Sequence, residues 1–256
     1  MVTRTGSNID DTGGILKLIK LPDLLSICNA LFGFFAILIV LADQSAGAIK
    51  AALAFILVAA VIDGLDGLAA RTVESSPIGR YLDSLADMNS FGIAPAIVTC
   101  SLYNSFSHLT YTHIELVSAF CGAYVICGML RLARFDANTA PEKEFVGFPI
   151  TGSAILLASF MLLSIEVDLP CYPAILVILM GMLCLLMISR IRYVKLRDFW
   201  IQVGTGIVFS LFFVCYAASL QLFVYPTAVI VALTALYIAS PIIRHLLNRK
   251  YALLQY

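Results

Sequence analysis

Four aspartates that are close together in the sequence could do chemistry: Asp63, Asp66, Asp83 and Asp87. Asp63 and Asp66 are three residues apart, and Asp83 and Asp87 are four residues apart. Residues at these spacings share one face of an α-helix, so the pattern predicts two acidic helix faces. The short segment between the two helices should bring these faces together.

Carboxylates that crowd together in an apolar setting repel one another unless cations neutralise them. A ligand set of carboxylates without His or Cys favours magnesium, manganese or calcium over zinc or copper. The sequence therefore predicts a divalent-metal site. The alternative is that the acids form structural ion pairs with Arg71 and Arg80.

Small residues beside the acids indicate that a flat or bulky ligand approaches the backbone closely. These residues are Gly64, Gly67, Ala69, Ala70 and Gly79. Arg71 directly follows Ala70 and is suited to binding a phosphate oxygen.

The elements that position these residues must lie in a membrane. The chain has 256 residues, of which 61% are hydrophobic and only 12% charged. Soluble domains have about 25% charged residues, so the composition argues against a water-soluble fold. Apolar stretches of bilayer-spanning length predict an all-α integral membrane protein with eight spans. We expect these spans at 22–42, 47–70, 82–103, 115–135, 147–166, 171–191, 200–222 and 226–246.

The basic residues predict the orientation of the spans. With a cytoplasmic N-terminus, all of the 16 lysine and arginine residues except Lys50 fall on the inner side. Both termini are therefore expected in the cytoplasm. Asp63 comes about 16 residues into the second span, roughly 24 Å deep, which places the acids at the cytoplasmic mouth.

The sequence predicts four segments along the chain. We expect a disordered cytoplasmic tail at 1–13, an amphipathic interfacial helix at 14–21, a catalytic transmembrane core at 22–192, and additional helices with a cytoplasmic C-terminus at 193–256. A net charge of zero gives no indication of a nucleic-acid partner. The seven cysteines are scattered through apolar spans, and we interpret them as small core side chains.

The acidic segment carries a recognisable signature. The pattern Asp63-x-x-Asp66-Gly67-x-x-Ala70-Arg71, followed by Gly79-x-x-x-Asp83-x-x-x-Asp87, resembles that of the CDP-alcohol phosphotransferase family. The runs 82–87, 90–96, 131–135 and 147–149 are similar to its phosphatidylserine synthase branch, which includes archaetidylserine synthases. Met88 and Asn89, between the first two runs, depart from the pattern of that branch. At the entrance to the first span, Asp23 and Ser26 stand where the family more often has Asn and Thr, which argues against a cytidine contact for Asp23.

This resemblance implies a fold, a reaction and a set of roles. The fold would be a six-helix core, here with two further C-terminal spans, in a homodimer within a prokaryotic cell membrane. The enzyme would transfer the lipid phosphate of CDP-diacylglycerol or CDP-archaeol to L-serine and release CMP. The metal would be held by Asp63, Asp66, Asp83 and Asp87, with Asp87 also the catalytic base. The CDP-lipid would contact Asn29, Asp66, Gly67, Ala70, Arg71, Gly79 and Asp83.

Some assignments have two interpretations. Arg131 and Arg134 either bind the acceptor or anchor the cytoplasmic face by their charge. Asn29 either contacts substrate or makes an interhelical hydrogen bond. There are two rival functions. One is a sibling enzyme that uses glycerol phosphate or inositol phosphate. The other is a divalent-cation transporter, which should have carboxylates near the midplane and helices broken in both halves of a repeat, and the sequence shows neither feature.

Overall fold

The computed structural model describes residues 19–69, 76–106, 111–137, 144–169, 172–194, 199–218 and 221–253. These residues form helices α1 (Leu21–Ala42), α2 (Ala46–Ala69), α3 (Gly79–Asp87), α4 (Ala94–Phe106), α5 (Tyr111–Ala137), α6 (Ile150–Glu166), α7 (Tyr172–Ile188), α8 (Phe199–Ala217) and α9 (Val224–Leu253). The π-helix η2 (Met88–Ile93), the 3₁₀-helix η3 (Gln221–Phe223) and strands β1 (Glu144–Val146) and β2 (Arg192–Val194) complete them. The expected tail at 1–13 and most of the expected interfacial helix at 14–21 lie outside the described residues.

The helices have the lengths and compositions that membrane crossing requires. Among the described residues, five helical segments are long and apolar enough to span a bilayer: Leu21–Ala42, Ala46–Asp66, Gly79–Ser105, Ile114–Ala137 and Gln221–Arg244. Three shorter apolar helices are Ile150–Glu166, Tyr172–Ile188 and Gln202–Ala217. A helix of 17 residues is about 26 Å long, near the lower limit for a span. The predicted all-α integral membrane fold is confirmed.

The start of α1 is fixed by its own sequence. Pro22 stands in the first turn, where its missing N–H costs no helical hydrogen bond. The carboxylate of Asp23 accepts a hydrogen bond of 2.7 Å from the backbone N–H of Lys20. This acidic cap also complements the positive end of the helix dipole. Asp23 therefore has a structural role at the entrance to the bundle.

We expect one continuous helix at 82–103, but the third span is not uniform. It begins as α3, continues through the π-helical turns of η2 and ends as α4. A π-helical turn holds an extra residue and changes the direction in which the following side chains point. Because η2 begins directly after Asp87, the irregularity lies beside the acidic residues.

A small antiparallel sheet, not predicted from the sequence, joins two of the interhelical connections. Phe145 of β1 pairs with Tyr193 of β2. Gly147 follows β1 with a positive φ of 82°, and a Cβ there would lie 2.4 Å from the carbonyl oxygen of Met187. Glycine is therefore required at this close approach. Helix α6 consequently begins at Ile150, after Pro149, and not at 147.

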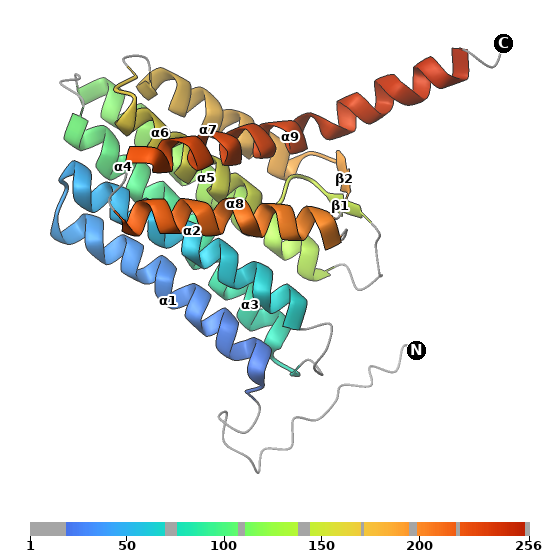
Figure 1. Cartoon of the computed structure of the whole chain (residues 1–256), viewed down its shortest axis with the longest axis horizontal. Helices are drawn as coiled ribbons and strands as arrows, with labels where there is room; N and C mark the ends of the chain where they lie inside the picture. The colour runs from blue at the N-terminus through green and yellow to red at the C-terminus, as the bar shows by residue number, and fades with distance from the viewer. Residues whose placement is uncertain are drawn as a thin grey trace.

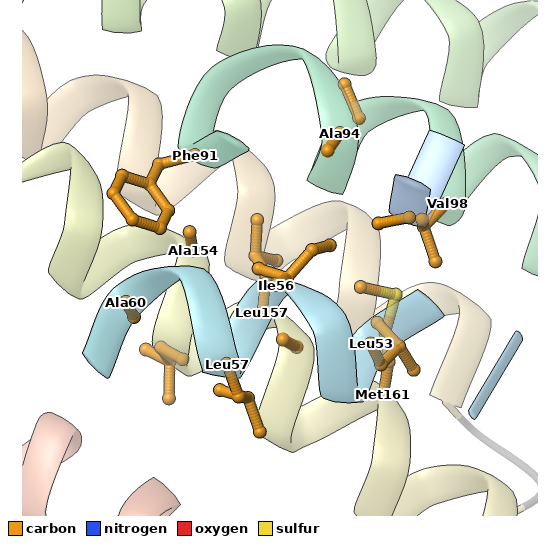
Figure 2. Packing of buried hydrophobic residues seen from close by; sticks show 14 of the residues in the cluster. Leu53, Ile56, Leu57, Ala60, Phe91, Ala94, Val98, Ala154, Leu157 and Met161 are labelled. Atoms are coloured by element: carbon orange, nitrogen blue, oxygen red, sulfur yellow. The ribbon is translucent and has the colours of Figure 1, made fainter. Parts of the chain in front are cut away.

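The core beneath the acidic residues is formed by three helical elements. Figure 2 shows side chains of α2, of the η2–α4 segment and of α6 packed together. The labelled members are Leu53, Ile56, Leu57, Ala60, Phe91, Ala94, Val98, Ala154, Leu157 and Met161. Close packing of this kind holds membrane helices together, because lipid supplies no hydrophobic force between them.

Consecutive spans alternate in direction, so that one end of the bundle collects the elements of the site. At the right of Figure 1 lie the start of α1, the end of α2, the start of α3, the end of α5 and both strands. Helix α9 runs back along the bundle, and its last turns extend beyond it. The connection between α1 and α2 lies at the opposite end.

Candidate active site

Three of the four predicted acids meet. Carboxylate oxygens of Asp63, Asp83 and Asp87 all lie within 4.8 Å of one another. Asp63 comes from the last turns of α2, whereas Asp83 and Asp87 lie one turn apart on α3. Asp87 is buried, with 8% of its surface exposed, and the other two are half-buried. The two acidic helix faces predicted from the spacing therefore face each other.

Asp66 lies beside this group and is held from α1. One of its carboxylate oxygens accepts a hydrogen bond of 2.7 Å from the hydroxyl of Ser26. The other oxygen is buried without a hydrogen-bond partner among the described residues. Asp66 also interacts electrostatically with Asp63 and Asp83. Its free oxygen is thus available to a cation.

Asn29 of α1 holds the buried end of the cluster. Its side-chain N–H donates to Asp87 Oδ1 at 3.3 Å, and its own Oδ1 is buried without a partner in the described part of the chain. The hydroxyl of Ser90 in η2 donates to the Asn29 carbonyl at 2.8 Å. Asn29 therefore makes the interhelical hydrogen bond that we considered.

The contact between α1 and η2 is unusually close. A Cβ at Gly33 would lie 2.3 Å from the Ser90 hydroxyl oxygen and 2.5 Å from its Cα. The side-chain N–H of Asn89 donates to the Ala30 carbonyl at 2.8 Å. These contacts fix the π-helical turns against α1 and, through them, the position of Asp87.

Gly79 has a packing role next to Asp23. A Cβ at Gly79 would lie 2.7 Å from an oxygen of Asp23, which also accepts a hydrogen bond of 3.0 Å from the Ser76 hydroxyl. Asp23 has only 2% of its surface exposed. Gly79 therefore lets the start of α3 approach the start of α1, and its predicted contact with the CDP-lipid stays a prediction.

Thr151 is a site residue that the sequence analysis missed. Its hydroxyl donates to Asp63 Oδ2 at 3.3 Å from the first turn of α6. The N-terminal end of α6, with its partial positive charge, thus lies beside an acidic group. A single threonine after a proline carries no spacing pattern, so only the tertiary structure reveals this contact.

The two arginines of α5 have different surroundings. Arg131 has 7% of its surface exposed, and its guanidinium interacts electrostatically with Asp63, Asp83 and Asp87. Arg134 instead donates to four backbone carbonyls, those of Val146, Ile188, Ser189 and Met187, at 2.7–3.2 Å. Arg131 belongs to the site, and Arg134 joins the ends of α7 and β1.

Arg80 binds the end of α5. Its Nε lies 3.2 Å from Asp136 and its Nη2 donates to the Phe135 carbonyl at 2.6 Å. Arg80 therefore forms an ion pair with an acid outside the group of four. Ala70 and Arg71 lie outside the described residues, and Gly67 lies in the last turn of α2.

The donor set fits a hard divalent cation. It consists of the carboxylate oxygens of Asp63, Asp83 and Asp87, which lie within 4.8 Å of one another. Asp66 and Asn29 each have a further buried oxygen without a partner among the described residues. Magnesium, manganese and calcium prefer such oxygen ligands. Buried oxygens without partners cost free energy, and a bound cation would offset that cost.

Comparison with known proteins determines the family. The model of the CDP-alcohol phosphatidyltransferase family matches residues 19–188, from the start of α1 to the end of α7. This chain belongs to the CDP-alcohol phosphatidyltransferase family. The family predicted from the aspartate signature is thus confirmed, and β2, α8 and α9 lie beyond the matched region.

Several curated members of the family are similar over much of their length. Archaetidylserine synthase of Methanothermobacter thermautotrophicus is 36% identical over 182 residues, covering 70% of this chain and 71% of the relative. CDP-diacylglycerol–serine O-phosphatidyltransferase of Methanocaldococcus jannaschii is 37% identical over 182 residues, covering 71% and 77%. The enzyme of that name from Bacillus subtilis is 34% identical over 144 residues, covering 55% and 75%.

Proposed function

We propose that this enzyme transfers the phosphatidyl or archaetidyl group of a CDP-lipid to the hydroxyl of L-serine and releases CMP. The observation that carries the proposal is the group of Asp63, Asp83 and Asp87 at one end of an apolar helical bundle. The names of the similar family members support serine as the acceptor. A site at the end of the bundle admits water-soluble serine while the lipid chains stay in the bilayer.

The reaction is a substitution at phosphorus. The serine hydroxyl oxygen attacks the phosphorus that carries the lipid, and a new oxygen–phosphorus bond forms. The bond from this phosphorus to the bridging oxygen breaks, and CMP leaves with the electron pair. Asp87 accepts the hydroxyl proton, because it is held by Asn29 at the buried edge of the carboxylate group.

The divalent ion would be held by Asp63, Asp66, Asp83 and Asp87. Their oxygen-only donor set suits magnesium, manganese or calcium. When bound, it would offset charge on the pyrophosphate and on the leaving CMP. Thr151 and Asn29 keep their carboxylate partners in place by hydrogen bonds. Arg131 adds a fixed positive charge toward the same group.

We place this end of the bundle at the cytoplasmic face, with both termini inside, in a prokaryotic cell membrane. The distribution of lysine and arginine supports this orientation. The enzyme would act as a homodimer, as its family resemblance implies. Gly67, Ala70, Arg71 and Gly79 would contact the CDP-lipid.

An acceptor panel tests the proposed function. The purified chain in lipid nanodiscs is given CDP-diacylglycerol or CDP-archaeol, Mn²⁺ or Mg²⁺, and one acceptor at a time. We expect CMP release with L-serine and none with glycerol phosphate or inositol phosphate. Release with a phosphorylated acceptor alone would instead identify the sibling enzyme.

The position of the acids argues against a cation transporter. Asp63 and Asp66 lie in the last two turns of α2, and Asp83 and Asp87 in the first turns of the third span. A transporter would place its acids near the bilayer midplane. Ion flux through proteoliposomes without CMP release would support that rival.

A further inference from the structure

A cluster of three aromatic rings lies where the C-terminal part of the chain meets the family core. It consists of Phe148, Tyr193 of β2 and Tyr237 of α9. The ring centroid of Phe148 lies 5.3 Å from that of Tyr193 and 5.8 Å from that of Tyr237. The centroids of the two tyrosines are 5.5 Å apart. Helix α9 reaches this position because it packs along α6. The two tyrosines lie beyond residues 19–188, the region that the family model matches.

This cluster contains a polar atom that the described fold leaves unpaired. Tyr193 is fully buried, and its hydroxyl has no hydrogen-bond partner among the described residues. A buried hydroxyl without a partner destabilises a protein, whereas ring packing alone would be served by phenylalanine. The hydroxyl of Tyr193 is therefore a candidate donor to a ligand.

Arg131 connects the aromatic cluster with the carboxylates. It interacts electrostatically with Tyr237 and also with Asp63 and Asp87. Tyr237 in turn interacts with Tyr193. Arg134, the other arginine of this region, donates to the carbonyls at the end of α7. A small acceptor beside Arg131 would thus have both the carboxylates and the phenolic hydroxyls among its neighbours.

We propose that Tyr193 and Arg131 bind the carboxylate of the amino-acid acceptor, and that Tyr237 of α9 is a positioning residue for Arg131. This rests on the proposed function, because it assigns the acceptor subsite of the same active site. A guanidinium and a phenolic O–H are both donors and match a carboxylate. The subsite would explain how a core common to several acceptors selects an amino acid, since its tyrosines lie beyond that core.

The test compares L-serine with L-serine methyl ester, which keeps the hydroxyl and the amine but lacks the negative charge. CMP release is measured for wild type, Tyr193→Phe and Tyr237→Phe, which keep the rings. For Tyr193→Phe we expect the KM for serine to rise about tenfold, with the KM for CDP-lipid unchanged. The kcat/KM for the ester should stay within about twofold of wild type, as expected when only the lost donor matters. Tyr237→Phe should show the same pattern with a smaller change.

Tyr172→Phe is the matched control, because the Tyr172 hydroxyl is also buried without a partner in the described structure. Tyr172 begins α7, whose opposite end contacts Arg134. The control variant should leave both acceptors unaffected. An unchanged serine KM in Tyr193→Phe would overturn the inference. An equal fall in kcat/KM for serine and for the ester would also overturn it, because that result indicates a structural role for the hydroxyl. Either result leaves serine transfer itself standing. A wild-type enzyme that releases no CMP with serine would instead overturn the proposed function.

Discussion

At the scale of single residues, the four aspartates have separate surroundings that indicate separate tasks. Asp63 accepts a hydrogen bond from Thr151, Asp66 accepts one from Ser26, and Asp87 accepts one from Asn29. Asp87 is the buried member of the gathered three. Its burial and its hydrogen bond from Asn29 support our proposal that Asp87 accepts the proton.

The first prediction concerns Asp87→Asn, which keeps the shape of the side chain and removes its basicity. We expect turnover to fall about 10³-fold, within the usual range for loss of a general base. CDP-lipid binding, measured separately by equilibrium dialysis of the labelled lipid in nanodiscs, should stay within about threefold of wild type. Asp43→Asn, an exposed change in the α1–α2 connection, is the control and should be active. Wild-type turnover in Asp87→Asn would exclude Asp87 as the base.

A second prediction separates the two arginines of α5. Arg134→Ala removes donors to four backbone carbonyls, so we expect the free energy of unfolding to fall by roughly 2–4 kcal/mol. Thermal unfolding in detergent measures the change, and Arg134→Lys should recover part of it. A serine KM that rises in Arg134→Ala without loss of stability would contradict this role and indicate direct acceptor binding.

At the scale of elements, helix periodicity explains what the sequence could predict and what it could not. Spacings of three and four residues place Asp63 with Asp66, and Asp83 with Asp87, on common faces whatever the surrounding fold. The π-helical turns after Asp87 depend on contacts with α1, such as Ser90 to Asn29, that no local pattern reports. Thr151 and the β1–β2 pairing likewise arise only when distant segments meet.

The third prediction tests the contact between α1 and η2. In Gly33→Ala the new methyl group would collide with the backbone and side chain of Ser90, so α1 must move away from η2. The hydrogen bond from Asn29 to Asp87 should weaken, and we expect turnover to fall at least about tenfold. Gly122→Ala in α5, where a Cβ meets no atom within 4 Å, is the matched control. Equal activity of the two variants would show that the close contact does not position Asp87.

At the scale of the whole molecule, the bundle has two chemically different ends. The end with the site also holds Arg80, Arg134 and the strand residue Arg192. At the other end Lys50, the one basic residue expected outside, forms an ion pair with Glu166. This pair neutralises a charge near the membrane surface, which is consistent with its position in the topology we propose.

The fourth prediction tests that topology. In a cysteine-free background, Ser45→Cys in the α1–α2 connection and Arg190→Cys after α7 are placed at opposite ends of the bundle. A membrane-impermeant maleimide added to intact cells should label the cysteine at 45 and leave the one at 190 unlabelled until the cells are opened. The reverse pattern would place the active site on the outer face.

The central claim is that the acidic residues gathered at one end of the bundle form a metal-dependent site for phosphoryl transfer. The most direct measurement is the initial rate of serine-dependent CMP release as a function of free Mn²⁺ and Mg²⁺, in wild type and in Asp83→Asn. We predict no release in EDTA, saturable activation by the ion in wild type, and at least about a tenfold higher ion requirement, or no activity, in the variant. An undiminished rate in EDTA, or identical activation of both proteins, would contradict the account.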